Sequence, residues 1–446
     1  MNGNLRRLLN PRSIAVVGGH WADALIEANR TLGYSGEVWH VHPSRPDCHR
    51  SIEELPGSPD ATFIGVLAKS APTVVRQLRA RGGGGFVCFA SGFEELDQSL
   101  LTDELRAAAA DTPFLGTNCY GFVNYLDGVA LWPDKVSNQR PARGVAIICQ
   151  SGGIGIGFTH SQRSLPIGYL ISVGNQTHIA VEDLIEELAE DGRVSAFGLY
   201  VEGIKDTARF KRAVAKARAA GKPIAIIKAG RTPAAAAAAV LHTASVTGDD
   251  SDFDSLCASA GIARCETLAT LIETLKVFHL GGPLRGNRVL AMAASAGYAI
   301  MTSDIARHTG LNFAAIPAAT ARELTEILGP RIVISNPFDF QTLHWHDQAR
   351  MRAMFTTLFA AGYDAIALMF GYPPLDCADT SGYDMPIDEY MDLAGNSPTR
   401  AAVLAPLPEF FSQKLRDRCI VKGVIPLQGH IEGLEALSAA ARVSRR

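Results

Sequence analysis

Short apolar runs rich in Val, Ile and Phe alternate with longer stretches of helical period along the 446-residue chain. Such short runs are typical of strands that are buried on both faces, and strands that alternate with helices indicate parallel sheets. The pattern therefore predicts the α/β class, with sheets covered by helices on both faces.

The first part of the chain has the pattern of a doubly wound, nucleotide-type domain. Its expected strands are residues 14–18, 38–42, 62–66 and 86–89, and its expected helices are residues 22–32, 71–81 and 98–110. From Pro133 to Arg143 the chain is polar, which is typical of a linker. We therefore expect the first domain to span residues 1–135.

Two further units repeat the pattern. The second has expected strands at residues 145–149, 169–173, 197–201 and 224–228, and the third at residues 288–293, 365–370 and 400–405. Gly281, Gly282 and Pro283 mark the boundary between them. We expect these domains to span residues 144–281 and 286–446.

Composition narrows the classes of function. A net charge of -3 without long single-sign runs disfavours a nucleic-acid or anionic-membrane surface. The eight cysteines form no C-x-x-C pair, so we expect core residues in a reducing compartment rather than a metal site. No apolar signal-like run opens the chain, and a cytoplasmic protein is expected.

Gly18 and Gly19 directly follow the first expected strand. A turn without Cβ atoms lets the backbone approach a phosphate, although an ordinary βα turn also carries glycine. The G-x-G-x-x-G fingerprint is absent, and the second strand ends in His40 and His42 rather than an acid. The sequence therefore disfavours an NAD site.

A second glycine turn, Ser151, Gly152 and Gly153, follows another expected strand and opens a helix. Free backbone amides, the helix dipole and a hydroxyl group there suit phosphate. The alternative is a serine N-cap that binds nothing.

Glu202 lies at the carboxyl end of an apolar strand, the edge at which open α/β sheets bind ligands. It could orient an imidazole, or be an ordinary solvated carboxylate. His242 follows the Ala-rich residues 234–239 and precedes Thr243, among small and hydroxyl side chains. Its ring suits nucleophilic attack on phosphate, although histidine is also common in polar loops.

Together these segments resemble the NDP-forming acyl-CoA synthetase superfamily, which includes ADP-forming acetyl-CoA synthetases and succinyl-CoA synthetases. The segments that carry the resemblance are residues 10–18, 91–93, 116–121, 150–153, 172–175, 182–184, 200–204, 230–248 and 336–339. The first turn departs from the family, because Gly-Gly-His stands where Gly-Ala-Ser is usual. The resemblance implies a Rossmann-like CoA-binding domain followed by two flavodoxin-like, doubly wound domains.

The resemblance also implies roles for single residues. His242 would carry phosphate, Glu202 would orient it, and Ser151, Gly152, Gly153 and Thr243 would bind the phosphate. The implied CoA contacts are Gly18, Gly19, His20, Pro43, Ser44, Ser91, Gly92, Phe93 and Asn118. No metal ligand is implied in this chain.

The implied activity converts a carboxylate, CoA and ATP to acyl-CoA, ADP and phosphate, through an acyl phosphate and a phosphohistidine. No segment resembles an ATP-grasp domain, so ATP/ADP with Mg²⁺ is expected on a separate ATP-grasp β-type subunit of a hetero-oligomer. The alternatives are a non-catalytic CoA-binding or acyl-CoA-binding regulatory subunit and a nicotinamide-dependent oxidoreductase.

Overall fold

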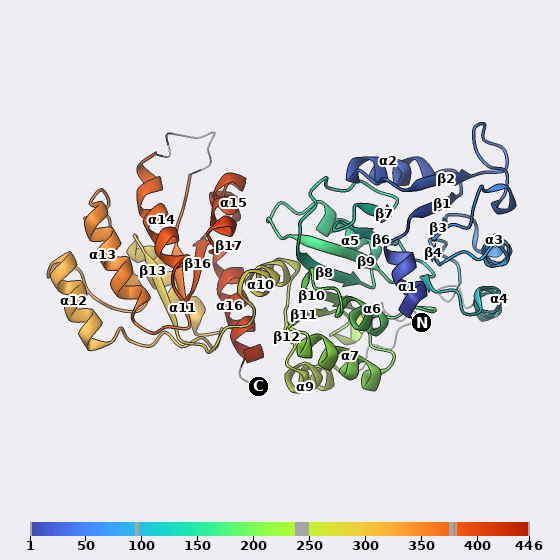
Figure 1. Ribbon diagram of the computed structural model, residues 1–446. Helices are drawn as coiled ribbons and strands as arrows, with labels where there is room; N and C mark the ends of the chain where they lie inside the picture. The colour runs from blue at the N-terminus through green and yellow to red at the C-terminus, as the bar shows by residue number, and fades with distance from the viewer. Residues whose placement is uncertain (1, 94–97, 237–248, 374–378, 380, 445–446) are drawn as a thin grey trace. The chain divides into compact units, whose positions relative to one another are not determined.

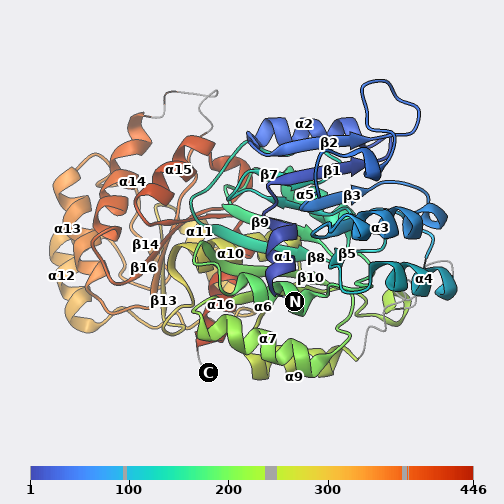
Figure 2. The same ribbon diagram turned by 45° about the vertical axis from the view of Figure 1, so that its right-hand side comes forward.

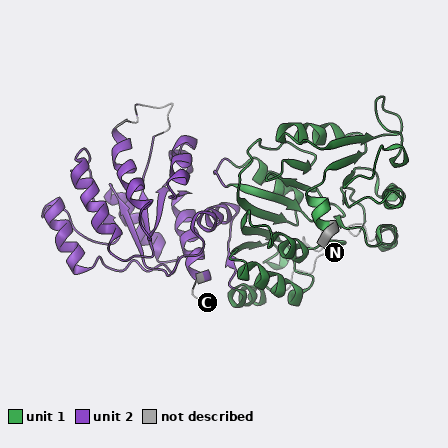
Figure 3. Cartoon of the chain, in the orientation of Figure 1, with its two compact units in different colours: residues 1–161, 166–260 green, residues 162–165, 261–446 purple. Residues whose placement is uncertain are grey.

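The computed structural model describes residues 2–93, 98–236, 249–373, 379 and 381–444. Strands and helices alternate along them (Figures 1 and 2), and the predicted α/β class is confirmed. By internal contacts the chain divides into unit 1, residues 1–161 and 166–260, and unit 2, residues 162–165 and 261–446 (Figure 3). The finer division at residues 135–144 and 281–286 stays a prediction.

The first sheet of unit 1 is parallel, with strand order β2-β1-β3-β4-β5. Its strands are β1 (Ser13–Val17), β2 (Glu37–Val41), β3 (Ala61–Ile64), β4 (Phe86–Cys88) and β5 (Phe114–Leu115). Its helical segments are α1 (Asn2–Leu9), α2 (Ala22–Leu32), η1 (Ile52–Glu54), η2 (Ala68–Ser70), α3 (Ala71–Ala80) and α4 (Ser99–Ala109). Ala15, Ile64 and Phe86 are fully buried, which explains why the apolar runs predicted these strands.

The second sheet of unit 1 has the order β11-β10-β8-β9-β6-β7. Its predicted parallel strands are β8 (Gly144–Cys149), β9 (Ile167–Ser172), β10 (Val194–Val201) and β11 (Ile224–Lys228). An antiparallel hairpin that was not predicted, β6 (Phe122–Asn124) and β7 (Val129–Leu131), pairs with β9. The helices are α5 (Gly152–Thr159), α6 (Val181–Leu188), α7 (Thr207–Ala219) and α9 (Asp250–Ala260).

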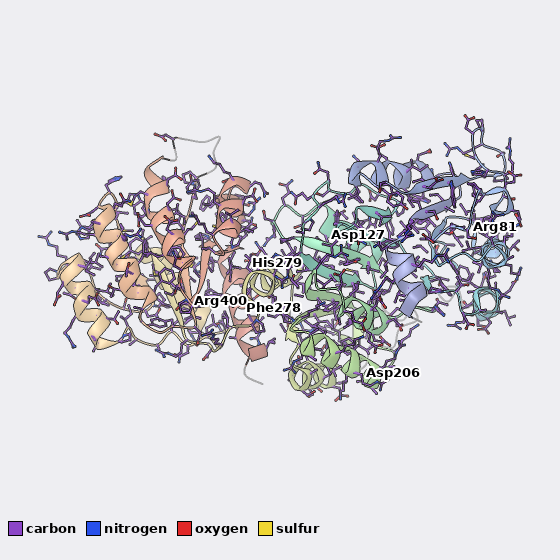
Figure 4. All side chains as sticks on the ribbon, viewed as in Figure 1. Arg81, Asp127, Asp206, Phe278, His279 and Arg400 are labelled. Atoms are coloured by element: carbon purple, nitrogen blue, oxygen red, sulfur yellow. The ribbon has the colours of Figure 1, made fainter. Side chains whose placement is uncertain are left out.

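Asp127, which is labelled in Figure 4, fixes the turn of this hairpin. The guanidinium of Arg193 donates to both of its carboxylate oxygens, at 2.8 and 3.0 Å. Burial alone would raise the pKa of Asp127, but the hydrogen bonds from Arg193 and Asn124 hold it below its usual value. The hairpin is therefore tied to the chain segment that enters β10.

Unit 2 contains a parallel sheet with strand order β14-β13-β15-β16-β17. The strands of this sheet are β13 (Val289–Ala293), β14 (Phe338–Asp339), β15 (Ala365–Met369), β16 (Arg400–Ala405) and β17 (Ile425–Gln428). The short strand β12 (Ala263–Arg264) is not part of it. Its helical segments are α10 (Leu268–Gly281), α11 (Ala296–Ala306), α12 (Ala318–Leu328), α13 (Gln348–Phe359), α14 (Ser381–Ala394), η4 (Pro408–Phe410), α15 (Gln413–Val421) and α16 (His430–Ser444).

The helices of unit 2 form two layers. On one side α12, α13 and α14 pack side by side, and elsewhere α16 packs against both α10 and α11 (Figures 1 and 2). The strands of the sheet between these layers contribute Leu290, Ile366 and Val403 to a continuous apolar core. Over the described part of the chain, none of the helices combines the length and the hydrophobicity needed to cross a lipid bilayer.

Candidate phosphate and CoA site

A cavity of about 1060 Å³ lies in unit 1 at the carboxyl ends of β1, β3, β4 and β8. Both sheets of the unit contribute to its lining. Of the predicted site residues, the lining includes Gly18, Gly19, Pro43, Ser91, Asn118, Ser151, Gly152 and Gly153. The structure therefore brings the predicted CoA turn and the predicted phosphate turn to one space. Glu202, His20, Ser44, Gly92 and Phe93 are described but are not part of this lining.

The turn after β1 requires glycine for a steric reason. Gly18 has φ +135°, and a Cβ on it would lie 2.5 Å from the carbonyl oxygen of Gly65, after β3. The amide of Gly65 in turn donates to the carbonyl of Val17 at 2.8 Å. The ends of β1 and β3 are thus in direct backbone contact, which leaves room for a ligand above them.

Two histidines hold the rim of the cavity. Nε2 of His40 lies 2.7 Å from the Gly18 carbonyl oxygen. Nδ1 of His42 accepts hydrogen bonds from the backbone amides of Ser44 and Arg45, at 3.2 and 3.1 Å. Ser44 is therefore turned toward His42. His20, which follows Gly19 in the chain, is exposed and packs edge to face on Trp21, with ring centroids 4.8 Å apart.

The segment after β4 has an inner and an outer side. Phe93 is fully buried in the core of the first sheet, and Gly92 has φ +95°. The amide of Asn118 donates to the carbonyl of Ala90 at 2.9 Å, which holds Asn118 at the cavity wall beside Ser91. Phe93 therefore packs in the core behind this wall and does not line the cavity itself.

The turn after β8 combines both interpretations of its sequence. Ser151 is the N-cap of α5, and its hydroxyl accepts from the amide of Ile154 at 3.4 Å. A Cβ on Gly152 would lie 2.5 Å from Cδ2 of Tyr120, whereas one on Gly153 would have only Ser151 Oγ nearby, at 3.9 Å. The first amides of a helix have no partner within it, so this positive helix end suits an anion.

Glu202 lies beside this turn because Gln150 connects the ends of β8 and β10. The side-chain oxygen of Gln150 accepts from the amides of Glu202 and Gly203, and its Nε2 donates to the Gly203 carbonyl at 2.7 Å. Glu202 is only 6% exposed. Gln150 was not predicted as a site residue, because its role depends on a contact some fifty positions away.

The thiols near the cavity are not activated. Burial raises the pKa of Cys119 to about 12, and its Sγ donates to the carbonyl of Ser172 at 3.0 Å. Burial also raises the pKa of Cys149. Both thiols are protonated at neutral pH, so neither is suited to act as a nucleophile.

The predicted phosphate carrier His242 and Thr243 lie outside the described residues. The chain on either side of them is described. Asp250, at the start of α9, pairs with Lys228 at 3.7 Å and with Arg231 at 3.2 Å. Lys228 ends β11 and is in register with Val201, directly before Glu202. The described residues that flank this segment, Arg231 and Asp250, thus lie near the end of β11, the strand paired with the one that leads into Glu202.

The chain is similar to known proteins in sequence and in fold. Residues 142–278 match the family described as the succinyl-CoA ligase like flavodoxin domain. In fold, the chain is similar to the dinucleotide-forming acetyl-coenzyme A synthetase 1 of Ca. Korarchaeum cryptofilum, solved with phosphate and ADP. The TM-score is 0.85 at 23% identity, covering 100% of this chain and 97% of that one.

Two curated relatives are similar to this chain in sequence. The chain is 29% identical to the α subunit of the ADP-forming acetate–CoA ligase II of Pyrococcus furiosus, over 74% of both proteins. It is 28% identical to a trans-feruloyl-CoA synthase of an unknown prokaryotic organism, over 77% of this chain and 51% of that protein. It therefore spans about half the length of the latter. The resemblance to the NDP-forming acyl-CoA synthetases is confirmed.

Proposed function

We propose that the chain is the α-type part of an ADP-forming acyl-CoA ligase, which converts a carboxylate, CoA and ATP to acyl-CoA, ADP and phosphate. One observation carries the proposal: the glycine turn after β1 and the positive end of α5 after β8 face the same cavity. The reaction requires such an arrangement, because the acyl group must meet both phosphate and the CoA thiol. The ADP-forming ligases among the relatives support the same reaction.

The cavity suits CoA as a substrate. Its volume is at the upper end of the range usual for small-molecule sites, roughly 300 to 1,000 Å³. Arg50 can face a phosphate, and Ser91 and Asn118 supply polar groups. The close contact of Gly18 with Gly65 keeps side chains out of the space over β1 and β3.

The proposed chemistry uses His242 as the carrier. A carboxylate oxygen of the acid attacks the phosphorus of the phosphorylated ring, so the P–N bond breaks and an acyl phosphate forms. The CoA sulfur then attacks the acyl carbon, phosphate leaves, and the thiol proton passes to solvent or phosphate. Glu202 would orient the ring, and the end of α5 would stabilise the phosphate charge.

The nucleotide half of the reaction is assigned to a partner. ATP/ADP with Mg²⁺ would bind an ATP-grasp β-type subunit, which rephosphorylates His242. The match to a relative named as an α subunit supports this division. We place the complex in the cytoplasm, where CoA and ATP are both available.

The carrier can be tested in the reverse direction without the partner. The full chain is incubated with labelled inorganic phosphate and a panel of acyl-CoA thioesters, and the protein is assayed for an acid-labile, base-stable adduct. We expect labelling of the native chain, none in His242→Ala, and about tenfold slower labelling in Glu202→Gln with an unchanged melting temperature.

Two results would contradict the proposal. Label retained in His242→Ala would exclude the carrier. Calorimetric binding of CoA without any phosphorylation, even with the ATP-grasp partner and ATP, would instead support the regulatory alternative.

A further inference from the structure

Unit 2 has its own cavity, of about 730 Å³, at the carboxyl edge of its sheet. Ala294 and Ser295 follow β13, and Phe370 and Gly371 follow β15. In the strand order β14-β13-β15-β16-β17, the chain changes direction between β13 and β15. Such a switch point is where open α/β sheets bind ligands. The reaction proposed above does not use this space.

Aromatic rings form most of the wall. Trp345 stacks on Phe370, with centroids 5.8 Å apart and planes at 8°. Tyr383 meets Phe370 and Trp345 edge to face, at 6.3 and 6.2 Å. The indole of Trp345 donates to the Gly382 carbonyl at 2.7 Å, and the hydroxyl of buried Tyr372 donates to Asp384 at 2.9 Å. The rings are therefore held in place before any ligand arrives.

Phe370 and Tyr372 are buried, but the other rings are only partly buried. Tyr383 is 38% exposed, and Trp345 and Phe410 are half-buried. A Cβ on Gly371 would lie 3.5 Å from Phe410 and 3.8 Å from Tyr298 Oη, which are ordinary contact distances, so a side chain can be added at this point of the wall without a clash. Aromatic side chains that enclose a concave space at a strand edge are typical of a site for a flat apolar ring.

The charge of the lining restricts the rest of the ligand. Among the described lining residues there is no Lys, Arg, Asp or Glu. A nucleotide would find no Lys or Arg for its phosphates among these residues, and His346 is the one titratable imidazole among them. The wall includes the first turn of α11, whose N-cap Ser295 is exposed and makes no capping hydrogen bond. This end favours one negative charge.

We propose that this cavity binds a small planar aromatic acid, a ring that carries a single carboxylate. The ring packs on the partly exposed Trp345 and Tyr383, and the carboxylate lies toward Ser295. The site is built from residues of unit 2, and its lining shares no residue with the cavity proposed for acyl transfer.

The test is calorimetry on the full chain with 4-hydroxycinnamate as the probe. Cyclohexanecarboxylate keeps the charge without the aromatic ring, and AMP keeps a ring but brings a phosphate. We expect 4-hydroxycinnamate to bind at least tenfold more tightly than either. Gly371→Val adds a branched side chain to the cavity wall, and Trp345→Ala removes one of its rings. We expect each variant to lose at least tenfold in affinity.

The control is Leu343→Ala, because Leu343 is 57% exposed and lies outside the cavity lining, two positions from Trp345. It should bind the probe like the native chain, and all three variants should bind CoA normally. Equal binding of the probe by folded Gly371→Val, or equal affinity for cyclohexanecarboxylate or AMP, would overturn the proposal. His242→Ala should leave probe binding unchanged, so failure of the carrier hypothesis would not affect this result.

Discussion

The first sheet of unit 1 and the sheet of unit 2 have the same topology but different cavities. In β2-β1-β3-β4-β5 and in β14-β13-β15-β16-β17, the first strand of the sheet lies between the second and the third. Each sheet has a cavity where the chain changes direction. Around β1 the wall joins two glycine turns and a helix end to a few rings such as Phe89, whereas around β13 a larger cluster of aromatic rings surrounds the space. Topology thus places a cavity, and the residues after each strand decide its ligand.

The largest expected difference between the two cavities concerns their glycines. Gly18→Ala should destabilise unit 1 by about 2 to 3 kcal/mol, because a methyl group would meet a backbone oxygen that cannot move aside. Gly371→Ala should change stability by less than about 1 kcal/mol, since its Cβ has ordinary contact distances. Urea denaturation of both variants measures this. A Gly18→Ala chain as stable as the native one would refute the backbone contact.

A second difference is a pH dependence expected for unit 2. His430 follows β17, its Nε2 lies 2.9 Å from Thr302 Oγ1, and burial lowers its pKa to about 4. The unfolded chain takes up this proton near the ordinary pKa of about 6.5. The contribution to stability is therefore complete above pH 6.5 and lost as the pH falls toward 4.

We expect this loss to reach about 2 kcal/mol at pH 4, and to be absent in His430→Gln. Unfolding followed from pH 7 to pH 4 measures it. The same slope in His430→Gln and in the native chain would assign the dependence to other groups.

The smallest expected effect is a difference between two substitutions in α5, one in its first turn and one further along the helix. Gly153 and Gly157 are both exposed in α5, and neither Cβ would clash. Each Gly→Ala change should stabilise the helix by up to about 1 kcal/mol. Only Gly153→Ala should slow phosphorylation, by about tenfold, because its methyl group would lie in the glycine turn that is proposed to bind the phosphate. Equal rates in the two variants would exclude this helix end from the reaction.

Much of the fold could be predicted from the sequence. The strands in 13–17, 144–149 and 365–369 are apolar on both faces, so the length of each apolar run identified them. Several short strands were missed, because the two or three residues of a strand such as 122–124 or 338–339 carry no period. The equally short β4 was predicted from its apolar run at 86–89. The reversal that makes β6 antiparallel depends on its pairing with β9, which no local pattern records.

The candidate site was predictable where turn chemistry is local. Glycine turns at 18–19 and 151–153 and the strand-end Glu202 could be found from strand position alone. The clamp made by Gln150 could not, because it joins β8 to β10 across the sheet. The aromatic wall around Trp345 and Tyr383 is likewise assembled from residues that are distant in the sequence, since Tyr383 belongs to α14. The roles of His242 and Thr243 stay predictions.

The β6–β7 hairpin limits how this protein can be rearranged by gene fusion or fission. Residues 122–131 precede the polar linker but complete the sheet that follows it. If the chain were divided within residues 133–143 and the first part lost, β9 would lose its partner β6. Its unpaired amides and carbonyls would then form an exposed sheet edge that is prone to aggregation. The first two sheets should therefore be inherited together, even in lineages whose other modules are shuffled.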